Sequence, residues 1–162
     1  MEYTMKDGTA YKIEPARDDQ WDDAMELAFC VFLKYEAKEY GREGTDKFAR
    51  FLTSNEIRKL FRTGHYILYV ATVDDKIVGL VSLRNGNHIS LLFVDEKYHK
   101  QGIGRELIGR LAQHLLMRTS FVKMTVHASP YGVPFYERLG FKATDKEQRQ
   151  DGIIYTPMEM YL

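Results

Sequence analysis

The spacing of apolar residues along the chain predicts a central strand followed by a long helix. A strand is expected over residues 88–94, whose apolar side chains occupy both faces: Ile89, Leu91 and Phe93 on one, Leu92 and Val94 on the other. Such a strand is covered on both sides. From Ile103 to Leu116 the apolar residues recur every three or four positions, which is the period of an amphipathic helix. We therefore expect the helix to begin close to Gly102.

Two further strands precede the central one. Residues 65–73 and 76–84 are rich in β-forming residues, and Asp74-Asp75 between them has the composition of a tight turn. Asn85-Gly86 is a second turn signal, directly before the central strand. The three strands are therefore predicted to form an antiparallel meander.

The chain after the long helix returns to the same sheet. Residues 121–127 alternate as a strand, and a right-handed crossover places this strand parallel to residues 88–94. Pro134 suits the first turn of a short helix, and Gly140 suits the left-handed position just past its end. Residues 152–160 are expected as the last strand.

The N-terminal third is predicted to be mainly helical. A short strand over residues 9–13 is followed by an acidic amphipathic helix that begins at Asp18 or Asp19. Glycines in residues 41–44 break this helix, and a second helical region follows with an interruption near residues 53–55. The pattern predicts no element for residues 142–150.

The composition is that of an ordinary globular protein, and we expect residues 1–162 to form a single domain. Lysine plus arginine and aspartate plus glutamate both number 23. The overall charge therefore favours neither nucleic acid nor a membrane as a partner. Acids concentrate in residues 14–39 and bases in residues 97–123, so an anionic ligand is expected in the second region.

Cysteine usage and the absence of a targeting segment favour a cytoplasmic location. The only cysteine, Cys30, cannot form an internal disulfide. Because it lies in an apolar helical run, we expect a buried structural thiol and not a nucleophile. No apolar run approaches the length of a membrane span, and the N-terminus lacks the pattern of a signal peptide.

The loop before the long helix has the features of an anion-binding site. In Gly102-Ile103-Gly104, missing β-carbons let a ligand approach the main chain. The first N–H groups of a helix lack intrahelical partners and carry partial positive charge, to which Lys100 and Arg105 add full charges. A plain helix start with a tight turn is equally compatible with these residues. The dinucleotide-binding and P-loop motifs are excluded, because the residues after Gly104 do not match either.

Several motifs follow one another in a family-specific order. These are a strand ending in Leu92-Phe93-Val94, a loop ending in Gln101-Gly102-Ile103-Gly104, a long helix, a parallel strand and the stretch FYERLGF at residues 135–141. Together they resemble the GNAT superfamily of N-acetyltransferases, over nearly the whole chain and most strongly from residue 88 to 141. The family loop commonly has Arg or Gln, any two residues, Gly, any residue, then Gly or Ala. His99 stands at the first of these places and departs from the pattern.

The resemblance implies an α/β fold of the α+β type with acetyl-CoA as co-substrate and no metal. The expected sheet is mixed, mostly antiparallel and twisted, with a central parallel strand pair splayed to admit CoA and helices on both faces. The pantetheine arm would pair with the central strand, and the pyrophosphate would lie on the amides of the loop. The implied cofactor-binding residues are Leu92, Phe93, Val94, His99, Lys100, Gln101, Gly102, Ile103, Gly104, Arg105 and Ser129.

The resemblance also implies a direct attack of an amine on the thioester. Tyr136 would protonate the departing thiolate, since a phenol with a pKa near ~10 stays protonated at neutral pH. The main-chain N–H near Phe93 is the candidate donor to the developing oxyanion. Tyr136 could instead simply pack against the sheet, and Ser129 could cap the next turn instead of contacting pantetheine. The general base is left open among His88, His127, Glu36 and Glu39.

The expected function is acetyl-CoA-dependent N-acetyl transfer to a primary amine of a small molecule or protein. The alternative is a catalytically silent CoA-binding regulatory module of the same fold. The sequence does not identify the acceptor, although the acidic N-terminal helices hint at a cationic one such as a polyamine or lysine. It also leaves open a homodimer and the use of acyl groups other than acetyl.

Overall fold

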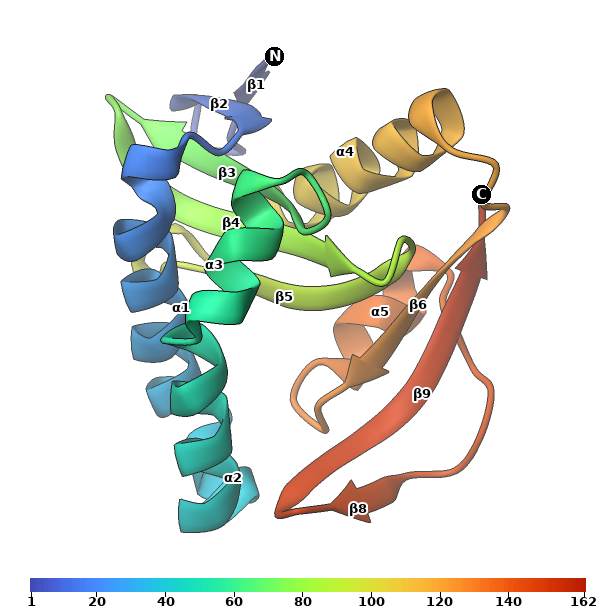
Figure 1. Cartoon of the computed structure of the whole chain (residues 1–162). Coiled ribbons are helices and arrows are strands. Elements are labelled where there is room, and N and C mark those ends of the chain that lie inside the picture. The colour runs from blue at the N-terminus through green and yellow to red at the C-terminus, as the bar shows by residue number, and fades with distance from the viewer.

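The strands of the protein form a nine-stranded mixed sheet (Figure 1). The computed structural model describes residues 1–162. The sheet order is β1-β2-β3-β4-β5-β6-β9-β7, with β8 paired to β9. All neighbours are antiparallel except β5 and β6, which run parallel. The strands are β1 (Glu2–Thr4), β2 (Ala10–Pro15), β3 (Ile67–Val73), β4 (Lys76–Arg84), β5 (His88–Val94), β6 (Lys123–Ala128), β7 (Lys142–Ala143), β8 (Gln148–Gln150) and β9 (Ile153–Tyr161).

Helices cover both faces of the sheet, as expected (Figure 1). One face carries the first three helices, α1 (Trp21–Tyr35), α2 (Ala37–Leu52) and α3 (Asn55–Arg62). The other face carries α4 (Ile103–Arg118) and α5 (Val133–Leu139). Each face has its own apolar core, and alternate residues of β3 enter the two cores. Single 3-10 turns lie at Asp18–Gln20 and Glu96–Tyr98.

A β-bulge in β5 changes which face its side chains occupy. Ser82 of β4 pairs with Leu91, whereas the next residue, Leu83, pairs with Ile89, so Ser90 is an extra residue without a partner on β4. As a result Ile89 packs in the core beside α4, while Leu91 and Phe93 pack in the core beside α1. Placing Ile89 on the same face as Leu91 was therefore wrong, because an inserted residue reverses the alternation beyond it.

The parallel strands β5 and β6 touch only at their beginnings. Two residue pairs join them, His88 with Thr125 and Ile89 with Val126. Beyond Ile89 the strands separate, and β6 follows β9 away from the rest of the sheet (Figure 1). The predicted splayed pair is thus confirmed, and the edge of β5 from Ser90 to Val94 has no strand beside it.

Some boundaries and exposures differ from the predictions. The first helix ends at Tyr35, ahead of the expected glycine break, and Gly41 instead kinks α2 with a φ of 68°. Cys30 is exposed and not buried, because it lies off the stripe of α1 residues that face the sheet. Residues 142–150, for which no element was predicted, contribute β7 and β8. No helix is both long and apolar enough to cross a membrane.

Candidate active site

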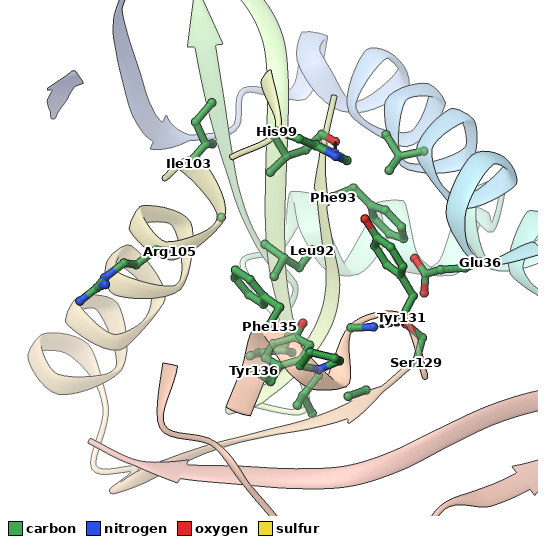
Figure 2. A pocket seen from close by; sticks show the side chains of 18 of the residues that line it. Glu36, Leu92, Phe93, His99, Ile103, Arg105, Ser129, Tyr131, Phe135 and Tyr136 are labelled. Carbon is green, nitrogen blue, oxygen red and sulfur yellow. Dashed lines mark hydrogen bonds between the residues drawn. The ribbon is translucent and has the colours of Figure 1, made fainter. Parts of the chain in front are cut away.

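A cavity of about 690 Å³ lies where β5 and β6 separate. Its walls come from α1, α2, β5, the loop after β5, the start of α4 and the segment from β6 to α5 (Figure 2). Eleven of the twelve site residues expected from the sequence line it: Leu92, Phe93, Val94, His99, Lys100, Gly102, Ile103, Gly104, Arg105, Ser129 and Tyr136. The fold therefore brings together residues that the sequence places up to 44 positions apart.

The expected residue that does not line the cavity is Gln101. Its side-chain Oε1 accepts a hydrogen bond from the main-chain N–H of Asp7 at 3.2 Å. The side chain thereby joins the loop after β5 to the turn between β1 and β2, which also brings Lys6 to the cavity wall. Gln101 thus supports the loop from outside.

The glycine loop presents a row of free main-chain donors. The N–H groups of residues 100–105 donate no hydrogen bond within the chain, and the Gly102 cap position of α4 has no side-chain cap. Lys100 and Gly102 have left-handed φ values of 62° and 90°, a turn geometry in which successive N–H groups converge on an anion. A β-carbon added at Gly102 would meet no protein atom within 4 Å, so the space above this row is open. The helix start adds partial positive charge.

The imidazole of His99 fastens this loop to β5. Its Nε2 lies 2.6 Å from the main-chain oxygen of Val94, and since a carbonyl only accepts, Nε2 carries the hydrogen. The ring also lies 5.2 Å from the ring of Tyr35. This chain has a histidine where the family commonly has Arg or Gln, and the histidine side chain holds the loop to the end of β5.

The free edge of β5 exposes the main chain of Leu92 and Val94 to the gap. Asp95 N–H donates to Val78 of β4 at 2.8 Å, and in the antiparallel register Phe93 lies opposite Leu80. Because N–H groups alternate in direction along a strand, the N–H of Phe93 faces β4, while those of Leu92 and Val94 face the gap. The side chain of Phe93 lines the cavity, but its own N–H points away from it.

Tyr136 lies at the inner end of the cavity on the short helix α5 (Figure 2). The side chain is buried, with its ring 5.3 Å from Phe135 and 5.1 Å from Phe141. Its hydroxyl forms no hydrogen bond within the chain. Burial raises the pKa of the phenol, and the nearby Glu36 and Tyr40 raise it further. Tyr136 is thus fully protonated at neutral pH, with a hydroxyl free to meet a ligand.

Glu36 joins α1 to α2 and points into the cavity toward Ser129 and Tyr131 (Figure 2). Burial raises the pKa of this carboxyl to about 7, the hydroxyl of Ser129 lowers it, and the charge of Glu39 raises it. Glu36 forms no salt bridge. The Ser129 Oγ also accepts from the Gly132 N–H at 3.1 Å, so this serine caps the turn before α5.

The charged side chains around the cavity are unevenly distributed. Glu36 is the only acidic residue in the lining, whereas four basic side chains contribute to it: Lys6, Lys100, Arg105 and Arg138. Lys6 and Lys100 lie at the glycine loop and Arg105 follows it on α4. One end of the cavity is therefore suited to an anion, and Glu36 marks a part suited to a cation.

Comparison with known proteins decides the family. A sequence model described as an acetyltransferase (GNAT) domain matches residues 36–162. The chain belongs to the GNAT acetyltransferase family. Among curated relatives, this GNAT chain is 37% identical over 82 residues to the uncharacterized N-acetyltransferase YafP of Escherichia coli, covering 51% of this chain and 49% of that protein. It is 34% identical over 86 residues to the peptidyl-lysine N-acetyltransferase YjaB of Salmonella typhimurium, covering 52% and 56%. The chain thus spans about half the length of these relatives.

Solved GNAT structures share the fold over nearly their whole length. A GCN5-related N-acetyltransferase from Rhodopseudomonas palustris is 21% identical with a TM-score of 0.80, covering 100% of this chain and 98% of that one. The PaiA N-acetyltransferase from Thermoplasma acidophilum, solved in complex with coenzyme A, is 18% identical with a TM-score of 0.74, covering 94% and 99%. At these identities the likeness shows a shared fold and nothing more specific.

Within this GNAT fold, the sequence motifs predicted the cavity residues of the glycine loop and α5 better than those near Glu36. The glycine loop and the α5 stretch are recognisable because their residues are adjacent in sequence. Lys6, Arg138, Tyr40 and Phe48 also line the cavity but were not expected there. The sequence placed Glu36 inside the first predicted helix, and no pattern separated it from the other candidate bases.

Proposed function

We propose that this GNAT chain transfers the acetyl group of acetyl-CoA directly to an amine. The observation that carries the proposal is the row of unpaired N–H groups from Lys100 to Arg105, which opens onto the cavity between β5 and β6. A pyrophosphate fits such a row, because it is an anion with several acceptor oxygens. The family match and the N-acetyltransferase names of the curated relatives support the same reaction.

In this proposal the pantetheine arm lies along the free edge of β5. Its amide groups would pair with the main chain as an added strand does. Leu92 offers both main-chain groups to the gap, whereas the carbonyl of Val94 is already used by His99. We therefore assign the pairing mainly to Leu92 and to the N–H of Val94, with the side chain of Phe93 and the hydroxyl of Ser129 in contact.

The proposed chemistry is a single displacement. The amine nitrogen attacks the thioester carbonyl, and the N–H of Val94 or Leu92 stabilises the developing oxyanion. The carbon–sulfur bond then breaks, and Tyr136 gives its hydroxyl proton to the thiolate. An acetyl-cysteine intermediate has no place in this scheme, because Cys30 is exposed on α1 and outside the cavity. A catalytically silent CoA-binding module finds no support in the relatives, which are named as N-acetyltransferases.

The site is tested by adding a side chain at the open loop. Gly102→Val places a branched side chain over the N–H row, and the matched control is Gly64→Val. Gly64 also has a left-handed φ, of 81°, and open space around it, but it lies outside the cavity. Both variants thus carry similar backbone strain. By calorimetry we expect Gly102→Val to weaken CoA binding by at least about tenfold, since hydrogen bonds to a charged group contribute about 1.5–3 kcal/mol each.

Gly64→Val should bind CoA as the wild-type protein does, and thermal unfolding will show that both variants are folded. Unchanged CoA affinity in a folded Gly102→Val variant would show that the cofactor does not bind at this loop, and would reject the proposed site.

A further inference from the structure

The carboxylate of Glu36 has a hydroxyl neighbour, Ser129, but no positively charged partner in the chain. It lines a cavity whose other charged side chains are basic, and it forms no salt bridge. A carboxylate held in a low-dielectric site without a counter-charge is costly. A ligand that supplies a positive charge would remove this cost.

The wall beside Glu36 is largely aromatic. Tyr40 and Phe48 line this part of the cavity with Phe93, and the rings of Phe48 and Phe93 lie 5.8 Å apart. Phe32 braces both Tyr40 and Phe48, at centroid distances of 5.1 and 4.3 Å. Aromatic faces attract cations, and their apolar surface excludes water. This surface and the carboxylate together fit an alkylammonium group.

We propose that Glu36 binds the ammonium group of the acceptor and then takes its proton, so that the acceptors are positively charged alkylamines. This inference rests on the proposed acetyl transfer and adds the acceptor class and the general base.

The other candidate bases are less suitably placed. His88 lies outside the cavity, with Nδ1 2.8 Å from Thr125 Oγ1. Glu39 is exposed and also outside it. His127 lines the cavity from β6, but its ring is stacked on Tyr155 at 4.2 Å and lies 4.7 Å from the ring of His88. Glu36 alone combines access with the aromatic wall.

The groups around Glu36 favour proton uptake. Glu39 and Tyr40 face it from the first turn of α2, Ser129 and Tyr131 from the segment after β6, and Tyr136 from α5. No basic side chain is among them. Burial raises the pKa of Glu36 to about 7, which is where a base working at neutral pH is most effective. Burial also lowers the pKa of a bound amine, because it disfavours the charged form.

The proton balance of the reaction is then complete. An alkylammonium carries three hydrogens on nitrogen, and the amide product of a primary amine carries one. The first proton passes to the Glu36 carboxylate and from there to solvent. The nitrogen lone pair forms the bond to the acetyl carbon while the electrons of the carbon–sulfur bond leave with sulfur. Tyr136 gives sulfur its proton, and the second proton from nitrogen restores Tyr136.

Two substitutions separate this role from a structural one. Glu36→Gln removes the base and keeps the shape, and Glu39→Gln is the matched control three residues later, in the first turn of α2 and outside the cavity. The acceptors are spermidine, a lysine-containing peptide and benzylamine as alkylammonium ions, and p-anisidine as an arylamine that is already neutral at pH 7. Release of CoA thiol is measured for each, together with CoA binding by calorimetry.

We expect Glu36→Gln to lower kcat/KM for the alkylamine that the wild-type protein uses best by at least about 100-fold. Acetylation of p-anisidine should stay within about threefold of wild type, because this nucleophile needs no prior deprotonation. The wild-type pH profile for the alkylamine should have an inflection near the pKa of Glu36, about 7, that Glu36→Gln lacks. Glu39→Gln and CoA affinity should change little.

Three results would overturn the inference. Alkylamine turnover in Glu36→Gln within about threefold of wild type would exclude the base. An equal loss of kcat/KM for alkylamines and p-anisidine would show that Glu36 maintains the shape of the cavity and is not the base. Wild-type acetylation of p-anisidine without any alkylamine would exclude the acceptor class. No turnover with any amine would instead contradict the proposed acetyl transfer itself, on which the inference rests.

Discussion

Replacing Tyr136 with phenylalanine removes one hydroxyl and keeps the ring that packs between Phe135 and Phe141. Because this hydroxyl has no hydrogen-bond partner in the chain, its loss leaves no buried group unpaired. We expect the free energy of unfolding to change by less than about 1 kcal/mol. Any large effect should therefore appear in the chemical step.

The size of the catalytic effect follows from the acid and the leaving group. General acids typically contribute ~10²–10⁴-fold. Burial raises the pKa of Tyr136, which makes it a weaker proton donor, and a thiol with a reference pKa near ~8.5 leaves fairly easily. Both facts favour the lower end of this range. We therefore expect kcat to fall about 100-fold, which corresponds to an increase of about 2.7 kcal/mol in the activation free energy.

The assay is single-turnover release of CoA thiol, with acetyl-CoA affinity measured in parallel. The matched control is Tyr131→Phe, which removes a hydroxyl from a half-exposed tyrosine of the same cavity and should leave kcat nearly unchanged. If Tyr136→Phe keeps kcat within about twofold while chemistry limits the rate, Tyr136 only packs and water protonates the thiolate.

Three further predictions concern other residues. Cys30→Ala should keep most of the activity, because Cys30 is exposed and outside the cavity; loss of turnover with CoA affinity retained would indicate an acetyl-cysteine intermediate. His99→Ala removes the bond to Val94 and should cost about 1 kcal/mol of stability and weaken CoA binding, both measurable by denaturation and calorimetry. Burial raises the pKa of Glu36 from its ordinary 4.5 to about 7, so between these values the folded state binds more protons than the unfolded state. The free energy of unfolding should therefore fall as pH rises from about 4.5 to about 7, and Glu36→Gln should reduce this slope when urea unfolding is compared across the window.

Local sequence patterns were sufficient to predict most of the fold. β4 and β5 have the predicted bounds, and Gly140 has the expected left-handed φ, of 106°. These features depend on turn residues and on the period of apolar residues, both of which are local. The parallel arrangement of β5 and β6 followed from the handedness of the crossover alone.

The features that the sequence did not reveal depend on contacts between distant segments. The bulge at Ser90 is defined by the register with β4, and it decides which core receives Ile89. Gln101 is turned away from the cavity by a bond to Asp7, from the other end of the chain. The altered pKa of Glu36 arises mainly from burial in a cavity whose walls come from segments far apart in the sequence. No local pattern carries that information.

The most direct test of acetyl transfer mixes the wild-type protein with acetyl-CoA and the amine panel, and measures CoA thiol and acetylated amine by mass spectrometry. We predict one molecule of CoA thiol for each molecule of acetylated alkylamine. CoA binding in calorimetry without amine-dependent thiol release for any member of the panel would contradict it.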